Sequence, residues 1–381
     1  MNVWQNLEKA TEANSLLTEK VYGVLKDIRW RSALKYAGAF IAWVIGSGFA
    51  TGQEILQFFG SYGYGSIAVL AVNLIGFAGF GIIMLSVGFD HRAEPGFNHY
   101  EYYCGKAIGR VYRVIMPITL VLLIAVLISA AGATVQQYYG INPILGSVIM
   151  ATVLIAVYLA GFEKMVKIVS GISPFVICFA VFVGVYSLLK DGGNYGTIGE
   201  YTEQLTEFRT APHWLLSAML YLSLNFLCGS TYYNAIGKTA DTKRNAILGV
   251  VIGTAALLIT MAAMNFAILC NAKDILEFPV PTLYLAQKIS GAFGIIFSVI
   301  LLMGMFSSCA TTVWSFCSEC FAHDPKKNRV FSVGTIIACT ALGFVPFGSL
   351  MSVVYPMIGY SGLVFMAAVA VKGIRNRMKK G

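Results

Sequence analysis

The sequence predicts an all-α integral membrane protein with ten membrane-spanning helices, and three observations support this prediction. Of its 381 residues, 57% are hydrophobic and 12% are charged, whereas about 25% are charged in typical soluble proteins. Ten apolar runs approach or exceed the length that crosses a bilayer. Lysine and arginine gather on one side of the resulting topology. A soluble fold could not bury so much apolar surface.

The ten runs divide into two groups of five that are joined by a long connection at 190–211. Their ranges are 34–59, 64–89, 112–138, 143–161, 164–189, 212–237, 245–270, 291–320, 330–346 and 349–371. A second long connection lies at 271–290. We therefore expect one membrane core at 31–371, with a first repeat at 34–189 and a second at 212–371.

The basic residues indicate the orientation of the chain. With the N-terminus in the cytoplasm, 23 of the 27 lysines and arginines fall on the cytoplasmic side. The other 4 are Lys190, Arg209, Lys273 and Lys288. This asymmetry follows the positive-inside rule and predicts two cytoplasmic termini. The net charge of +9 thus reflects topology and does not indicate a nucleic-acid partner.

The two ends of the chain are polar. Residues 1–30 are polar and lack an apolar core of suitable length, so we do not expect a signal peptide there. We expect a cytoplasmic amphipathic helix that lies on the bilayer, with an unstructured tail as the alternative. Residues 372–381 form a basic cytoplasmic tail.

Several functional classes find no support in the sequence. Cys317 and Cys320 form a lone CxxC pair, which lacks the further ligands that a zinc site requires. The pattern contains no nucleophile–base pair, no metal motif and no nucleotide-binding loop. We therefore expect neither an enzyme nor a bound organic cofactor or structural metal.

The first apolar run is interrupted by the stretch GSGFATGQE at 46–54. A break in a membrane helix leaves backbone polar groups that protein, water or a ligand must satisfy. Such a break therefore predicts a binding site near the middle of the bilayer, where carbonyls and N–H groups of two half-helices face the ligand. A glycine-rich helix that packs tightly is the alternative.

The sixth apolar run repeats this feature. Its stretch LSLNFLCGSTYYNAIG at 222–237 begins apolar and becomes polar halfway. Interrupted helices at matching places in two halves predict an inverted repeat with the site between the halves. We therefore expect the first and sixth helices to be discontinuous.

At this level the chain resembles the LeuT fold of the amino acid–polyamine–organocation superfamily. The stretches GFEKMVKIVSGISP (161–174), LSLNFLCGS (222–230), MNFAILCNAKD (264–274), PVPTLYLAQKISG (279–291) and GMFSSCATT (304–312) are similar to neurotransmitter:sodium symporters. The stretch GSGFATGQE resembles bacterial YkvI-type membrane proteins. The resemblance covers about residues 30–371 and implies a transporter in the bacterial cytoplasmic membrane.

The resemblance implies a substrate site for an amino acid or a related zwitterion. The substrate carboxylate would meet N–H groups near Ser47, Gly48 and Phe49, and its ammonium would meet carbonyls of the first and sixth helices. The full set that the resemblance implies is Trp43, Gly46, Ser47, Gly48, Phe49, Ser223, Phe226, Leu227 and Ser230. The aromatic gate of the family falls at Phe226, and its third-helix tyrosine would lie near Leu127 or Ser129.

The resemblance also implies a sodium site. Its oxygen ligands would be Ala42, Ile45, Gly304, Ser307 and Ser308. Carbonyls and hydroxyls suit a hard cation. Alternatively, the two serines bond back to carbonyls of their own helix. The coupling ion is therefore Na+ or H+.

Glu54 is the carboxylate that follows the break. An acid in a membrane helix is a functional candidate, because it could carry a proton, act in gating or contact a cationic group of the substrate. The alternative is a hydrated acid in an outer vestibule, paired with Gln57. Glu163 and Glu319 lie beside basic residues and are expected to form ion pairs near the cytoplasmic face.

These features predict a cation-coupled secondary transporter of a small organic solute that works by alternating access. Its partners would be that solute and the lipid bilayer. The alternative is a ligand sensor on the same fold that does not transport, because a fold does not determine a function. Neither the solute nor an oligomeric state follows from the sequence.

Overall fold

The structure is a computed structural model that describes residues 29–45, 47–94, 96–160, 162–321 and 325–378. Within these ranges the chain forms helices and no β-strand, which confirms the predicted all-α class. Most of the amphipathic segment expected at 1–30 lies outside the described residues, as does the end of the tail.

Each of the ten predicted apolar runs contains helix. The first half holds α2 (Trp30–Val44), α3 (Ser47–Thr51), α4 (Gln53–Phe58), α5 (Ser66–Asp90), α6 (His99–Tyr139), α7 (Pro143–Ala160) and α8 (Phe162–Asp191). The second half holds α10 (Trp214–Lys238), α11 (Lys243–Leu269), α14 (Gly291–Phe321), α15 (Pro325–Leu342) and α16 (Phe347–Met378). The connecting elements are η1 (Gly60–Gly65), η2 (Gly192–Tyr201), α9 (Thr202–Thr206), α12 (Ala272–Ile275) and α13 (Pro281–Ile289).

Six helical stretches within the described residues are long and apolar enough to cross a membrane. They are Gly60–Asp90, His99–Tyr139, Trp214–Lys238, Lys243–Leu269, Gly291–Cys317 and Phe347–Asn376. Shorter apolar helices lie at Pro143–Leu159 and Val330–Leu342. The chain is therefore a multi-pass membrane protein.

The helix α6 differs most from its predicted range. It begins at His99 rather than near residue 112, and a kink at Gly105 (φ 76°, ψ 170°) divides a short first segment from the long one. Asn98 caps the short segment. The side-chain oxygen of Asn98 accepts hydrogen bonds from the backbone N–H groups of Tyr100 and Glu101. Such a cap satisfies N–H groups that have no partner inside the helix.

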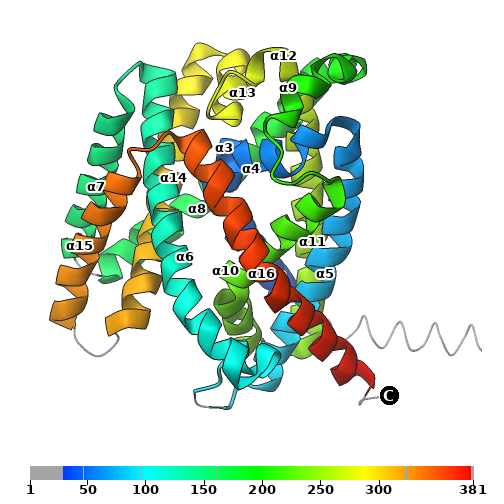
Figure 1. Cartoon of the computed structure of the whole chain (residues 1–381), viewed down its shortest axis with the longest axis vertical. Coiled ribbons are helices and arrows are strands. Elements are labelled where there is room, and N and C mark those ends of the chain that lie inside the picture. Colours follow the sequence, from blue (N-terminus) through cyan, green and yellow to red (C-terminus); the bar gives the residue numbers. More distant parts are fainter. Residues whose placement is uncertain (1–28, 46, 95, 161, 322–324, 379–381) are drawn as a thin grey trace, which may run out of the picture.

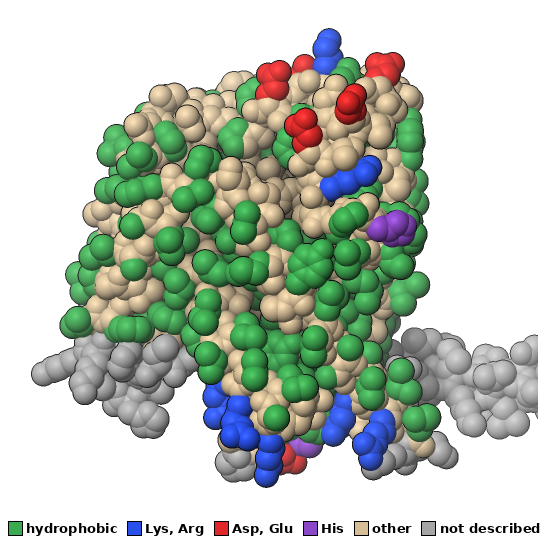
Figure 2. Space-filling model, viewed as in Figure 1, with side chains coloured by type: hydrophobic (Ala, Val, Ile, Leu, Met, Phe, Trp, Pro, Cys, Tyr) green, Lys and Arg blue, Asp and Glu red, His purple; other side chains and the backbone are tan. Residues whose placement is uncertain are grey.

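The two ends of the bundle differ in charge. The short helices α9, α12 and α13 cover one end, and the C-terminus lies near the other (Figure 1). On the face drawn in Figure 2, lysine and arginine gather at the end near the C-terminus, most acidic side chains lie at the opposite end, and hydrophobic side chains cover the middle. We refer to these as the basic end and the capped end.

Glycine contacts hold α10 closely against its neighbours. A methyl group at Gly237 of α10 would lie 2.2 Å from the carbonyl oxygen of Leu85 in α5. A methyl group at Gly88 of α5 would lie 2.2 Å from the carbonyl oxygen of Asn234. On another side, Gly362 of α16 meets the backbone of α10 in the same way. Small residues let membrane helices approach this closely, so α10 is fixed between α5 and α16.

The helix α10 is continuous from Trp214 to Lys238. The prediction that the sixth helix is discontinuous is therefore wrong for this structure. Its polar side chains bond back to its own carbonyls: Asn225 to Tyr221, Ser230 to Leu227 and Asn234 to Ser230. These bonds accommodate polar residues within a continuous helix, so polarity alone did not indicate a break.

Candidate functional site

The predicted interruption of the first apolar run is confirmed. The helix α2 ends at Val44, and Ile45 has φ −80° and ψ 62°. The short helix α3 then ends at Gly52, whose φ of 78° is left-handed and favours glycine. The hydroxyl of Thr51 donates to the carbonyl of Gly48 at 2.7 Å and accepts from the N–H of Gln53 at 3.3 Å. The chain therefore changes direction twice before α4 begins.

Glu54 lies in the first turn of α4 and folds back over this break. A Cβ at position 48 would lie 1.8 Å from Glu54 Oε1 and 2.7 Å from the hydroxyl oxygen of Tyr355. The carboxyl group therefore occupies the space that a side chain at Gly48 would need. Only glycine at position 48 permits this arrangement of Glu54 and Tyr355.

Two tyrosine hydroxyls donate to the Glu54 carboxylate. Tyr221 of α10 donates to Oε2 at 3.4 Å, and Tyr355 of α16 also forms a side-chain hydrogen bond with it. Glu54 is 8% exposed, and Tyr221 and Tyr355 are 0% and 4% exposed. The interpretation of Glu54 as a hydrated acid in an open vestibule is therefore wrong for this structure.

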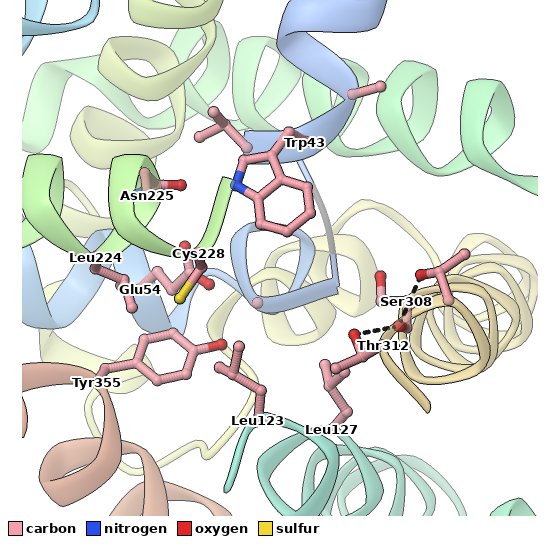
Figure 3. Close-up of a pocket in the computed structure, with 14 residues that line it drawn as sticks. Trp43, Glu54, Leu123, Leu127, Leu224, Asn225, Cys228, Ser308, Thr312 and Tyr355 are labelled. Carbon is pink, nitrogen blue, oxygen red and sulfur yellow. Dashed lines mark hydrogen bonds between the residues drawn. The ribbon is translucent and has the colours of Figure 1, made fainter. Parts of the chain in front are cut away.

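Glu54 lines a cavity of about 170 Å³ between helices from both halves of the chain. In Figure 3, the carboxyl of Glu54 lies close to Cys228, and the hydroxyl of Tyr355 points toward the same region. The cavity is lined by Ala42, Trp43, Val44, Gly48, Glu54, Leu123, Leu127, Leu224, Asn225, Cys228, Ser308, Thr311, Thr312 and Tyr355. Within this lining, Glu54 is the one carboxylate, and there is no lysine, arginine or histidine. Its charge therefore has no cationic partner among the described residues that line the cavity.

The cavity is covered on the side of the capped end. Phe49, Ala50 and Thr51 have no exposed surface, and the hydroxyl of Thr282 in α13 donates to the carbonyl of Ala50 at 2.5 Å. Thr311 lines the cavity from α14 and is exposed. Because α14 starts next to α13, Thr311 lies on the half of α14 nearer the basic end. The lining of the cavity therefore reaches the surface of the described chain at Thr311.

The face of α10 that meets the cavity differs from the one that the resemblance implied. Leu224, Asn225 and Cys228 line the cavity, because residues three and four apart share one face of a continuous helix. Ser223 instead donates to the carbonyl of Gly359 in α16 at 2.5 Å.

The other implied residues of the sixth helix have neighbours away from the cavity. Phe226 packs against Phe77, with ring centroids 5.3 Å apart. Leu227 is fully buried. Ser230 accepts or donates at 3.0 Å with His99 Nε2, near the start of α6.

The implied residues of the first helix are divided. Trp43 and Gly48 line the cavity, whereas Phe49 is fully buried outside its lining. Gly46 and the side chain of Ser47 lie outside the described part of the chain, as do the side chains of Glu163 and Glu319. Near the position implied for a third-helix tyrosine, Leu127 does line the cavity.

The implied sodium ligands lie in the same region of the molecule. Ala42 and Ser308 both line the cavity, and Ile45 and Ser307 are each 5% exposed. Gly304 faces α8, where a Cβ would lie 3.0 Å from Val176. Helix α14 contacts α3, the short helix that follows Ile45, and the sodium site stays a prediction.

The carbonyls of α14 at this site accept hydrogen bonds from threonines. Thr311 donates to the carbonyls of Ser307 and Ser308 at 3.1 and 3.0 Å. Thr312 donates to the carbonyl of Ser308 at 2.7 Å, as drawn in Figure 3. The two threonines thus bond back to carbonyls of their own helix.

Sequence reasoning did not identify Tyr355, Asn225, Cys228, Thr311 and Thr312. Asn225 and Cys228 lie within LSLNFLCGS (222–230), and Thr311 and Thr312 lie within GMFSSCATT (304–312), but the resemblance assigned no role to any of the four. For Tyr355, the sequence signal that could have indicated a functional position is the proline that follows it, Pro356, in the last apolar run. A proline in a membrane helix often accompanies a functional irregularity.

Comparisons with known proteins yield two relatives of similar length. The chain is 23% identical over 356 residues to the "Uncharacterized membrane protein YkvI" of Bacillus subtilis (strain 168), covering 91% of this chain and 97% of the relative. It is 20% identical over 359 residues to the "Uncharacterized protein YyaD" of the same organism, covering 92% and 99%. The resemblance to YkvI-type proteins is confirmed as a similarity. No family model matches the chain.

Solved structures with a similar course of the chain include two transporters. A Na+-coupled sialic acid symporter in a substrate-bound outward-open state is 14% identical, covers 89% of this chain and 86% of its own, and has a TM-score of 0.47. A variant of the manganese transporter of Eremococcus coleocola is 15% identical, covers 90% and 78%, and has a TM-score of 0.45. What this chain binds has to follow from its own cavity.

Proposed function

We propose that the chain is a secondary transporter that carries a small organic solute through this cavity by alternating access. One observation carries the proposal: an interrupted membrane helix places a buried carboxylate in a cavity between helices of both halves. A break and a buried acid each destabilise a membrane protein unless protein groups, water, a ligand or an ion satisfy them, and both are common at functional sites. Their coincidence at one cavity supports a transport site.

The accessibility of the cavity agrees with this proposal. It is covered on the side of α13, and its one exposed lining residue on α14, Thr311, lies on the half of that helix nearer the basic end. In a transporter this arrangement is the inward-facing state of an alternating-access cycle, with the basic end in the cytoplasm. The gathering of lysine and arginine at that end in Figure 2 supports the orientation.

The proposal includes the architecture expected from the sequence. All ten runs cross the bilayer in a LeuT fold of the amino acid–polyamine–organocation superfamily, with inverted repeats at 34–189 and 212–371. Five crossings per half give the halves opposite orientations. Both termini are then cytoplasmic, and the protein lies in the bacterial cytoplasmic membrane.

Transport is coupled to Na+ or to H+ in this proposal. Sodium would be held by Ala42, Ile45, Gly304, Ser307 and Ser308. A proton would be carried by Glu54. The sequence-based candidate for the solute is an amino acid or a related zwitterion, and the charge of the cavity bears on that candidate below.

The test begins with thermal unfolding of the purified full chain in detergent. Single amino acids, betaine and small amines are added in sodium, potassium or choline buffers at two pH values. A ligand that binds the folded state raises the unfolding midpoint. Any solute that does so is then supplied, radiolabelled, to proteoliposomes under a sodium or a pH gradient.

Gradient-driven accumulation of that solute in liposomes is the expected result. Binding without accumulation would overturn the transporter proposal and favour the ligand sensor, which should require a partner protein. Stabilisation that depends on sodium would support the sodium site. Stabilisation that depends on pH alone would favour Glu54 as the coupling group.

A further inference from the structure

We propose that Glu54 is the counter-charge for a positively charged substrate, and that the solute is a small organic ammonium compound without a carboxylate. This inference rests on the proposed function and narrows its substrate class. It departs from the amino acid that the resemblance implied. Four features of the cavity carry it.

The first feature is the charge of the lining. Glu54 is the one carboxylate among the described lining residues, and they include no lysine, arginine or histidine. A carboxylate in a membrane cavity is stable when a cation neutralises it. A substrate ammonium would supply that charge, whereas a substrate carboxylate would add a second negative charge with no basic side chain to offset either.

The second feature is the position of the carboxyl group. Glu54 Oε1 fills the space next to the backbone of Gly48, at 1.8 Å from the position of a Cβ there. The expected amino-acid site placed the substrate carboxylate against the same stretch of backbone. The protein therefore already supplies the carboxylate that an amino-acid substrate would have brought.

The third feature is the remaining wall of the cavity. Trp43 and Tyr355 contribute aromatic rings, and leucines contribute an apolar surface. Aromatic rings attract organic cations through their electron-rich faces. The leucines at 123, 127 and 224 suit the alkyl part of an amine. The volume of about 170 Å³ lies below the ~300–1,000 Å³ of pockets for drug-sized ligands, so the cation must be small.

The fourth feature concerns metal ions. Among the described residues, no group of three or more histidine, cysteine, aspartate or glutamate side chains could hold a metal. Glu54 and Cys228 alone fall short of the ligand sets that divalent transition metals use. A divalent transition metal therefore does not match the described lining of this cavity as the partner of Glu54.

The test compares pairs of compounds that differ by one carboxylate. The pairs are 3-methylbutylamine with leucine, ethanolamine with serine, and choline with glycine betaine. Each is titrated against the full-length protein in detergent, and affinity is read from the rise of the unfolding midpoint in a potassium buffer. We expect at least one amine of the three pairs to bind at least ten-fold more tightly than its carboxylated partner.

The variant Glu54→Gln tests the role of the carboxylate, because it keeps the shape of the side chain and removes its charge. We expect it to weaken amine binding by at least ten-fold. The control is Glu203→Gln, an exposed acid on α9, which should bind the amine like the wild type. Should Glu54→Gln fail to fold, Glu54→Asp keeps the charge, shortens its reach and should retain the preference for the amine with several-fold weaker binding.

The inference is overturned if amino acids stabilise the wild type and the amines do not, or if Glu54→Gln binds the amine as tightly as the wild type. It is also overturned if no amine of the panel stabilises the protein at millimolar concentration. The proposed function fails separately: an amine that binds through Glu54 and does not accumulate in proteoliposomes supports the counter-charge and excludes transport. An amino acid that accumulates in proteoliposomes would support transport and overturn the proposed counter-charge role of Glu54.

Discussion

The contact between Gly48 and Glu54 leads to a quantitative prediction about stability. A Cβ introduced by Gly48→Ala would lie 1.8 Å from Glu54 Oε1, and real Cβ atoms essentially never approach within 3.0 Å. The carboxyl group must therefore move by about 1 Å or more. This movement disturbs its hydrogen bonds with Tyr221 and Tyr355, each of which contributes roughly 1.5–3 kcal/mol when the acceptor is charged.

We expect Gly48→Ala to lower the free energy of unfolding by about 2–4 kcal/mol, which combines the weakened hydrogen bonds with the cost of overpacking. In a Glu54→Ala background the nearest obstructing group is gone, and the Tyr355 hydroxyl, 2.7 Å from the same Cβ, can move into the space that the carboxyl group leaves. The same substitution should then cost less than about 1 kcal/mol. Unfolding by SDS in mixed micelles measures all four proteins of this double-mutant cycle.

The matched control for this cycle is Gly38→Ala in α2. Nothing lies within 4 Å of a Cβ there, and alanine is favoured over glycine inside a helix by about 0.5–1 kcal/mol. We therefore expect a slight stabilisation. Equal costs of Gly48→Ala in both backgrounds, within about 0.5 kcal/mol, would refute the contact.

Two further predictions concern packing and the coupling ion. Gly237→Ala should destabilise the protein by about 1–3 kcal/mol, because its Cβ would lie 2.2 Å from the carbonyl oxygen of Leu85. The control Gly334→Ala in α15 has open space around it and should not destabilise the protein. Equal midpoints of thermal unfolding for the two variants would contradict this packing. Ser307→Ala should raise the sodium concentration needed for a given rise of the unfolding midpoint by roughly ten-fold, since one of about five oxygen ligands is lost. An unchanged sodium titration would exclude Ser307 as a ligand.

The sequence predicted the break at 46–54 because its signal is local. Glycine, serine and threonine within an apolar run are poor material for a helix, and Gly52 takes up a left-handed conformation. The same reasoning failed for α10, where Asn225 and Ser230 bond to carbonyls of their own helix. The polarity of a residue does not reveal whether its partner lies in the same helix or in a ligand.

The partners of Glu54 could not be predicted from the sequence. Tyr221 and Tyr355 reach it from α10 and α16, and their meeting depends on how tightly these helices pack. The side of α10 that faces the cavity depends in turn on its continuity, because one missing helical bond would rotate Leu224 and Cys228 away. The rotation of a helix about its axis is set by tertiary packing, and the pattern of apolar residues in a membrane helix does not predict it.

The hydrogen bond between Thr282 and Ala50 has a mechanical consequence. It ties the outer helix α13 to the short helix α3 at 2.5 Å, and a Cβ at Gly52 would lie 2.8 Å from the side chain of Thr282. A tilt of helix α3 toward the capped end would therefore either break this hydrogen bond or move α13 with it. A displacement of Glu54 and the turn at Gly52 would therefore be transmitted to α13, one of the short helices that cover the capped end.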